Sequence, residues 1–145
     1  MLARDVRPNR LDRAKFEARQ LFSRLRGDRV GMIVFAGTSH LYLPFTGDYD
    51  AARLFLDAVE TSMIQIQGTA LAHAINLATE SFPDDDSKFR TLILFTDGED
   101  HEGDVSAAVE SAKREGIVIH VAGMGSQDHV PIPVINSMGI VTDYK

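Results

Sequence analysis

Asp97 is the side chain in this sequence whose type and position most suggest chemistry. It lies just beyond the unbroken apolar run of residues 91–95, which predicts a buried strand. A carboxylate fixed by a rigid strand can bind a hard cation or act as a general base. A plain turn, in which Asp97 accepts hydrogen bonds from loop amides, explains the same residues. The local sequence leaves both interpretations open.

Thr69 is the second candidate, and it precedes a segment with helical periodicity. Its hydroxyl can cap that predicted helix, or it can point at a cation at the same sheet edge as Asp97. Gly68 before it permits a close approach of the backbone. The sequence around Thr69 does not choose between capping and cation binding.

Other motifs give weaker signals. The glycines and serine of residues 123–126 match half of a dinucleotide-binding fingerprint, but no helix is predicted after them. No Gly-x-Ser-x-Gly elbow and no Walker lysine loop occurs. His101 has no second histidine four residues later, so it starts no zinc protease motif. His120 falls in a predicted buried strand, which favours its interpretation as a core histidine. We interpret the acids after Asp97 as a solvated loop without EF-hand spacing, ending in a helix N-cap: Glu99, Asp100, Glu102 and Asp104.

Composition excludes several classes of protein. The chain has 145 residues, no cysteine, and 15 basic against 21 acidic side chains, a net charge of −6. The missing cysteines exclude a disulfide scaffold, a thiol nucleophile and a cysteine-ligated metal. The negative charge argues against binding of nucleic acid. No apolar run is long enough to span a bilayer, so we expect the chain as given to be soluble.

The hydrophobic pattern predicts alternating helices and strands. Residues 30–36, 91–95 and 117–122 are continuous apolar runs, typical of strands covered on both faces. Residues 40–43 predict a short edge strand that Pro44 ends. Helices are expected to begin near Asn9, Thr46 or Asp48, Thr69 and Asp104, and the last twenty residues to be irregular or a small hairpin. The expected buried stripe of the second helix is Ala51, Leu54, Phe55, Ala58 and Val59.

This order of elements predicts an α/β fold. We expect a Rossmann-like, doubly wound, mostly parallel sheet with helices on both faces and one antiparallel edge strand. Ligands of such sheets bind outside the carboxyl ends of the strands. The loops expected at that edge are residues 37–40, 65–69, 96–104 and 123–126.

Several stretches, taken in order, resemble the von Willebrand factor A domain. They are MLARDVRPNRLDRAK at residues 1–15, GDRVG at 27–31, FAG at 35–37, QGTA at 67–70, TDGED at 96–100 and GMG at 123–125. The RPNRL and DGEDHE stretches make the chain similar to the bacterial aerotolerance-type (Bat) subgroup. The likeness covers essentially all of the chain.

The resemblance implies a metal-ion-dependent adhesion site. In the family, an Asp-x-Ser-x-Ser loop after the first strand, a threonine and an aspartate hold Mg²⁺, and an acidic side chain of a partner protein completes the coordination. Thr69 matches the threonine and Asp97 the aspartate.

The resemblance also implies one domain over residues 1–145 that is incomplete at both ends. The Asp-x-Ser-x-Ser loop and the first strand would precede Met1, and that strand would lie centrally between residues 30–36 and 91–95. Because Thr69 and Asp97 alone cannot tightly coordinate a strongly hydrated ion, we expect weak or no Mg²⁺ binding by this chain alone. The strand edges left open invite self-association or pairing with the chain's own tail.

We therefore expect a non-enzymatic protein–protein interaction module. The resemblance implies partners that offer an acidic residue, among them a MoxR-type AAA+ ATPase or envelope proteins, and a native protein anchored in the bacterial inner membrane. The alternative is a phosphotransfer or hydrolytic α/β domain that uses Asp97 with a divalent cation. That alternative lacks a lysine near residues 123–126, where a phosphoacceptor domain usually has one.

Overall fold

A computed structural model describes residues 9–64, 66, 68–84, 89–97, 104–125, 133–135 and 141–144. Within them the elements follow in this order: α1 (Arg10–Arg24), β1 (Val30–Phe35), β2 (Ser39–Thr46), α2 (Tyr49–Asp57), a 3₁₀ turn η1 (Thr61–Met63), α3 (Leu71–Ser81), β3 (Arg90–Thr96), α4 (Val105–Arg114), β4 (Ile117–Gly123), β5 (Pro133–Ile135) and β6 (Val141–Tyr144).

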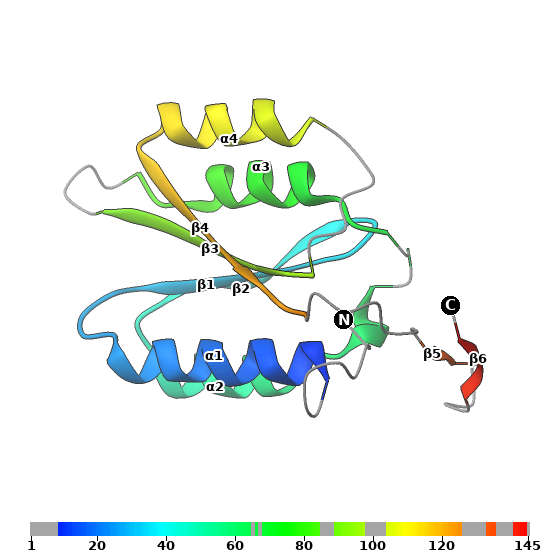
Figure 1. Cartoon of the computed structure of the whole chain (residues 1–145). Helices are drawn as coiled ribbons and strands as arrows, with labels where there is room; N and C mark the ends of the chain where they lie inside the picture. The colour runs from blue at the N-terminus through cyan, green and yellow to red at the C-terminus, as the bar shows by residue number, and fades with distance from the viewer. Residues whose placement is uncertain are drawn as a thin grey trace.

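The helices form two layers with the strands between them. Figure 1 shows α1 and α2 on one side of β1–β4 and α3 and α4 on the other. β1 pairs with β2 in the antiparallel sense, and β3 pairs with β4 in the parallel sense. In the same view β1, β3 and β4 end on the side where α1, α3 and α4 begin. This arrangement confirms the predicted α/β fold with helices on both faces.

The sheet is split between β1 and β3. Among the described residues, β1 pairs only with β2 and β3 only with β4, so the strands form separate two-stranded sheets. The family resemblance implied a central strand at this place, and the split lies where that strand was expected. β5 and β6 form a further antiparallel pair, the small hairpin expected near the C-terminus.

The prediction that Pro44 ends the second strand was wrong. β2 runs on to Thr46, and its register with β1 shifts at the proline: Met32 pairs with Leu43, but Val30 pairs with Thr46. A bulge on an edge strand tolerates a residue that has no N–H to donate. Opposite the bulge, a Cβ on Gly31 would lie 3.3 Å from the Phe45 ring, so a glycine fits there.

α1 begins as predicted. The Asn9 side chain accepts a hydrogen bond from the backbone N–H of Asp12 at 2.8 Å, which is N-capping geometry. Ala14, Ala18 and Phe22 are buried and lie at helical spacing on one face of α1. One hydrophobic cluster joins this face to β2 and α2 through Ala18, Phe22, Leu43, Ala52 and Leu56.

The buried stripe predicted for α2 was wrong. Ala52 and Leu56 are buried, whereas Leu54 is 71% exposed and Phe55 is 39% exposed. Both sets of residues have helical spacing, so periodicity alone cannot choose between them. The choice is made by the surface on which α2 packs, because α1 and β2 contact it from one side.

α3 and α4 cover the opposite face of β3 and β4 with small side chains. Ala72 and Ile75 of α3 and Ala108 and Ala112 of α4 are buried together with Leu94 and Ile117, in a second cluster. The small size of these alanines lets the two helices approach the strands closely. These contacts hold β3 and β4 against α3 and α4.

β4 is less covered than predicted. Val118 is 53% exposed and Val121 65%, and His120 is also exposed, so the interpretation of His120 as a core histidine was wrong. Among the described residues β4 has a strand on one side only, which leaves its outer edge uncovered. No helix in the described part of the chain combines the length and apolarity needed to cross a membrane.

Candidate functional site

β3 delivers Asp97 to the carboxyl edge of the strands. Leu94 and Thr96 are buried, at 5% and 6% exposure, so the strand that precedes Asp97 is firmly packed. The backbone N–H of Met124 donates to the carbonyl of Thr96 at 2.7 Å and joins the ends of β3 and β4. The backbone position of Asp97 is therefore fixed by both strands.

The Asp97 carboxylate pairs with Arg10, the first residue of α1. The distance from Arg10 Nη1 to Asp97 Oδ2 is 3.4 Å, and the two side chains are 11% and 16% exposed. This pair was not predicted from the sequence. The two residues are 87 positions apart, and no local pattern signals such a contact.

The surroundings of Asp97 favour its charged form. Burial alone would raise the pKa of this carboxyl, but hydrogen bonds, including one from its own backbone, and positive charge nearby, including Arg10, more than offset the burial. The pKa of Asp97 is therefore lowered from its usual value, and the side chain is an anion at neutral pH.

Arg10 is enclosed on a second side by the end of β4. A Cβ placed on Gly125 would lie 3.3 Å from the guanidinium carbon and Nη2 of Arg10, and 3.4 Å from its Nε. The absence of a side chain at position 125 thus leaves room for the guanidinium. The start of α1 and the ends of β3 and β4 meet around this one side chain.

Thr69 does not cap α3. The N-cap residue is Ala70, and its helix end has no side-chain cap, so the capping interpretation of Thr69 was wrong. Thr69 is half-buried, and within the described residues its hydroxyl has no hydrogen-bond partner. That hydroxyl is therefore available to a ligand.

The backbone around Thr69 is tied to the end of β1. Ala70 N–H donates to Ala36 O at 2.6 Å, and Gly37 N–H donates to Ile66 O at 2.9 Å. Gly68 has φ +134°, and a Cβ there would lie 3.3 Å from the Gly37 Cα. The glycines allow the two loops to touch, as the sequence suggested for Gly68.

Thr69 and Asp97 lie at the same carboxyl edge of the strands, but their side chains do not contact each other through a hydrogen bond within the described residues. Thr69 is held at the end of β1 and Asp97 at the end of β3, and Figure 1 shows both strands ending on the same side. No hydrogen bond joins the two side chains in the described residues. Their convergence on one ion stays a prediction.

The described residues do not by themselves fit Mg²⁺. They contain no group of three or more His, Asp or Glu side chains able to hold a metal ion. One carboxylate, already paired with a guanidinium, and one neutral hydroxyl are too few for an ion that prefers six oxygen ligands. The acids at positions 99, 100 and 102, His101 and Ser126 lie outside the described residues.

Asp104 caps α4 as predicted, accepting from Ala107 N–H at 3.0 Å.

A second polar contact that was not predicted from the sequence links β2 to α3. Ser39 Oγ lies 2.5 Å from His73 Nδ1, and Ser39 is 5% exposed. In the described part of the chain no carboxylate orients this histidine, so the pair has no third member of a hydrolytic triad. Its evident effect is to fasten the first turn of α3, which follows Thr69, to the start of β2.

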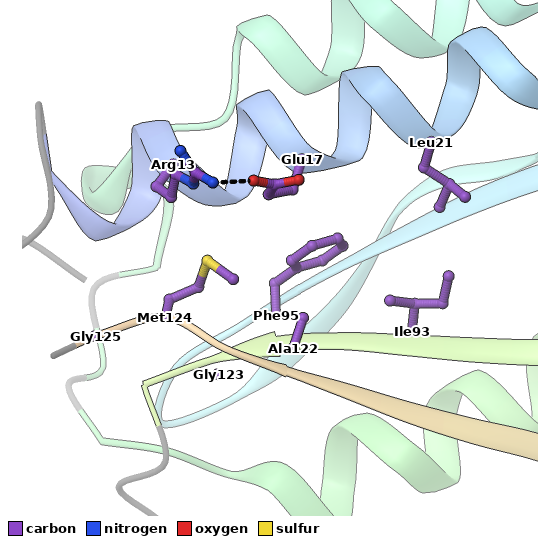
Figure 2. A pocket seen from close by; sticks show the side chains of 9 residues that line it. All are labelled: Arg13, Glu17, Leu21, Ile93, Phe95, Ala122, Gly123, Met124 and Gly125. Atoms are coloured by element: carbon purple, nitrogen blue, oxygen red, sulfur yellow. Dashed lines mark ion pairs between the residues drawn. The ribbon is translucent and has the colours of Figure 1, made fainter. Parts of the chain in front are cut away.

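A groove of about 660 Å³ runs between α1 and the strands β3 and β4. Figure 2 shows Phe95 and Met124 on the strand side and Leu21 on α1, with the Arg13–Glu17 ion pair at 2.5 Å on the helix side. Its walls are mainly aliphatic and aromatic, and Gly123 and Gly125 line the end nearest the carboxyl edge.

Comparison with known proteins identifies related sequences. A family model described as the von Willebrand factor type A domain matches residues 1–99. A UPF0353 protein from Mycolicibacterium paratuberculosis is 32% identical over a 139-residue alignment that covers 88% of this chain and 42% of that protein. A Borreliella burgdorferi protein is 23% identical over 86% of this chain and 37% of its own length. The chain thus spans less than half the length of the curated relatives it matches.

Solved structures resemble the whole chain. An aerotolerance-related membrane protein from Bacteroides fragilis has a TM-score of 0.89 at 41% identity, and BatB from Bacteroides thetaiotaomicron has 0.90 at 44%. Each match covers 100% of this chain and 75% of the other. A mussel byssus matrix protein with zinc in its metal-ion-dependent adhesion site has a TM-score of 0.71 over 79% of this chain and 33% of its own, at 16% identity, which shows a shared fold.

Proposed function

The chain belongs to the von Willebrand factor type A family, and from that premise we propose that it is a non-enzymatic protein-interaction domain that binds at the carboxyl edge of its strands. The observation that carries this proposal is the placement of Asp97, an ionised carboxylate held at that edge by a buried strand. The hydroxyl of Thr69, which lies beside the end of β1 and has no hydrogen bond within the described residues, supports it. In doubly wound folds this edge is where ligands bind.

Thr69 and Asp97 are the residues of this chain that we assign to the family's metal site. When bound in a complete site, Mg²⁺ would supply positive charge for an acidic side chain of the partner. Because the two residues do not fit the ion by themselves, and because the ionised Asp97 alone would repel an acidic side chain, binding of such a partner requires the metal of a complete site. The proposal extends to residues 1–145 as one domain whose split sheet takes up a further strand between β1 and β3.

The proposed partner is a MoxR-type AAA+ ATPase or an envelope protein that presents an acidic residue. Support comes from the 41% and 44% identity to Bat-type proteins over all of this chain. The Bacteroides fragilis relative is described as a membrane protein. We accordingly propose that the whole protein is anchored in the bacterial inner membrane, with this domain outside the bilayer.

No observation favours the phosphotransfer alternative. A phosphoacceptor aspartate works beside further carboxylates that hold a divalent ion, and the described residues offer no such group around Asp97. Within the described residues, Asp97 instead pairs with the Arg10 guanidinium. An interaction role needs neither a nucleophile nor a base at this edge.

The test measures binding of the purified chain to a MoxR-type ATPase from the same genome by biolayer interferometry in a buffer that contains Mg²⁺. Asp97→Asn removes the edge carboxylate and should weaken binding about tenfold or more, as loss of a buried interfacial charge does. Asp50→Asn makes the same change in the first turn of α2, where the side chain is 91% exposed, and should leave affinity unchanged.

Two results would overturn parts of the proposal separately. Wild-type affinity in the Asp97→Asn chain would refute the binding surface. No binding by the wild-type chain would refute this partner, while the edge could still be tested with candidate envelope proteins.

A further inference from the structure

The Asp97 carboxylate is paired with a cation that belongs to the chain itself. Arg10 Nη1 lies 3.4 Å from Asp97 Oδ2, with both side chains mostly buried. At such exposure the pair is less screened by solvent than an ion pair on the outer surface. Removal of either partner would therefore weaken the electrostatic stabilisation of the charge that remains at the edge.

The position of Arg10 is built into the fold on two sides. Asn9 caps α1 by accepting from Asp12 N–H at 2.8 Å and also donates to the Asp12 carboxylate at 2.7 Å, which fixes where the helix starts. On the other side, Gly125 lies against the guanidinium, where a Cβ would come within 3.3 Å. The Arg10 side chain is therefore held in a defined position between α1 and the ends of β3 and β4.

We propose that Arg10 acts as a resident cation of the carboxyl edge and competes with divalent ions for Asp97. The two positive groups need the same carboxylate, and they repel each other when both lie near it. The poor fit of the described residues to Mg²⁺ is then more than a shortage of ligands, because the one carboxylate assigned to the site is already engaged. This inference rests on the proposed function, since it concerns the same edge.

A consequence is that a ligand that takes Asp97 releases α1. Arg10 is the first residue of α1, so loss of its pair loosens the contact between the first turn of that helix and the end of β3. Occupation of the edge is thereby coupled to the start of α1 and to the entrance of the groove beneath it. Arg10 is a positioning residue in this scheme and touches the ligand only through Asp97.

The experiment measures Mn²⁺ binding to the whole chain by the loss of the free-ion electron paramagnetic resonance signal. Arg10→Gln removes the competing charge and should bind Mn²⁺ about tenfold more tightly than wild type, the change expected from one charge–charge interaction of moderate strength. Arg10→Lys keeps the charge and should stay near wild type. The Arg10→Gln/Asp97→Asn chain should lose the gain.

Arg13→Gln is the matched control. Arg13 lies in the same helix turn, carries the same charge and pairs with Glu17, but its side chain is 50% exposed and its pair is on the helix. It should leave Mn²⁺ affinity at the wild-type value. Equal affinity in Arg10→Gln and wild type, or a gain that survives the loss of Asp97, would overturn the proposal.

A second measurement covers the case in which Arg10→Gln does not fold. In the wild-type chain, hydrogen exchange of amides in the first turn of α1 is compared with that in Asp97→Asn and Asp50→Asn. Faster exchange in Asp97→Asn alone is expected, and equal exchange in all three would overturn the coupling. Neither readout uses a protein partner, so failure here differs from failure of the binding assay above.

Discussion

Gly68 lies against Gly37, so that a Cβ added at Gly68 would come within 3.3 Å of the Gly37 Cα. This contact joins the loop before α3 to the loop after β1. It sets Thr69 at the carboxyl edge together with the backbone bond from Ala70 N–H to Ala36 O. The position of one candidate site residue therefore depends on two glycines that have no chemistry of their own.

Gly68→Ala should destabilise the fold. Its φ of +134° is strained for any residue with a Cβ, and the added methyl would meet Gly37 backbone. We expect a loss of about 1–3 kcal/mol in the free energy of unfolding, measured by urea denaturation. Gly47→Ala is the control, because nothing lies within 4 Å of a Cβ there. Equal stability of the two variants would contradict the observed contact.

Ile75→Ala should be among the most costly truncations. Ile75 is 1% exposed and lies in the cluster between α3, α4 and the strands, where a removed side chain leaves a cavity. A loss of about 2–5 kcal/mol is expected by urea denaturation. Leu54→Ala removes a side chain that is 71% exposed and should change stability by no more than about 0.5 kcal/mol. A similar cost for both variants would show that α2 buries the face first predicted for it.

Sequence reasoning located most elements because their signals are local. The Asn9 cap, the apolar run before Asp97 and the Asp104 cap each lie within a few residues of what they determine. The contacts that build the site are not local. Arg10 meets Asp97 across 87 positions, and Ser39 meets His73 across 34, through the fold alone.

The wrong predictions have the same physical origin. Pro44 disfavours a central strand, but β2 has a free edge and a bulge that tolerate it. The continuous apolar sequence of β4 predicted a strand covered on both faces. Within the described residues, however, β4 pairs only with β3, and Val118 and Val121 remain exposed. Each outcome depends on neighbours that the local sequence does not specify.

Those valines give a test of self-association. An apolar strand edge without a neighbour can pair with another chain, so we predict concentration-dependent association of the wild-type chain. Val118→Lys/Val121→Lys places charge on β4 and should shift the equilibrium toward monomer by sedimentation velocity. Thr79→Lys, on the half-buried flank of α3, is a comparison outside the strand edges. An unchanged distribution in the β4 variant would place any association elsewhere.

The stability that Asp97 contributes should depend on pH in the acid range. Because the pKa of Asp97 is lowered on folding, its ionised form stabilises the fold above the unfolded-state pKa of about 3.9, and this contribution is lost as the pH falls through the folded-state pKa. The difference in unfolding free energy between wild type and Asp97→Asn should therefore shrink as the pH is lowered below about 3.9. Urea denaturation across that range measures it. A difference that stays constant would contradict the lowered pKa.

The most direct test of the binding surface is amide chemical-shift mapping of the ¹⁵N-labelled chain on addition of the MoxR-type ATPase. We expect the largest changes at residues 36–38, 68–71, 96–97 and 124–125, extending to Arg10. Changes confined to the opposite end of the strands, around Asp28 and Tyr49, would contradict the proposed binding surface.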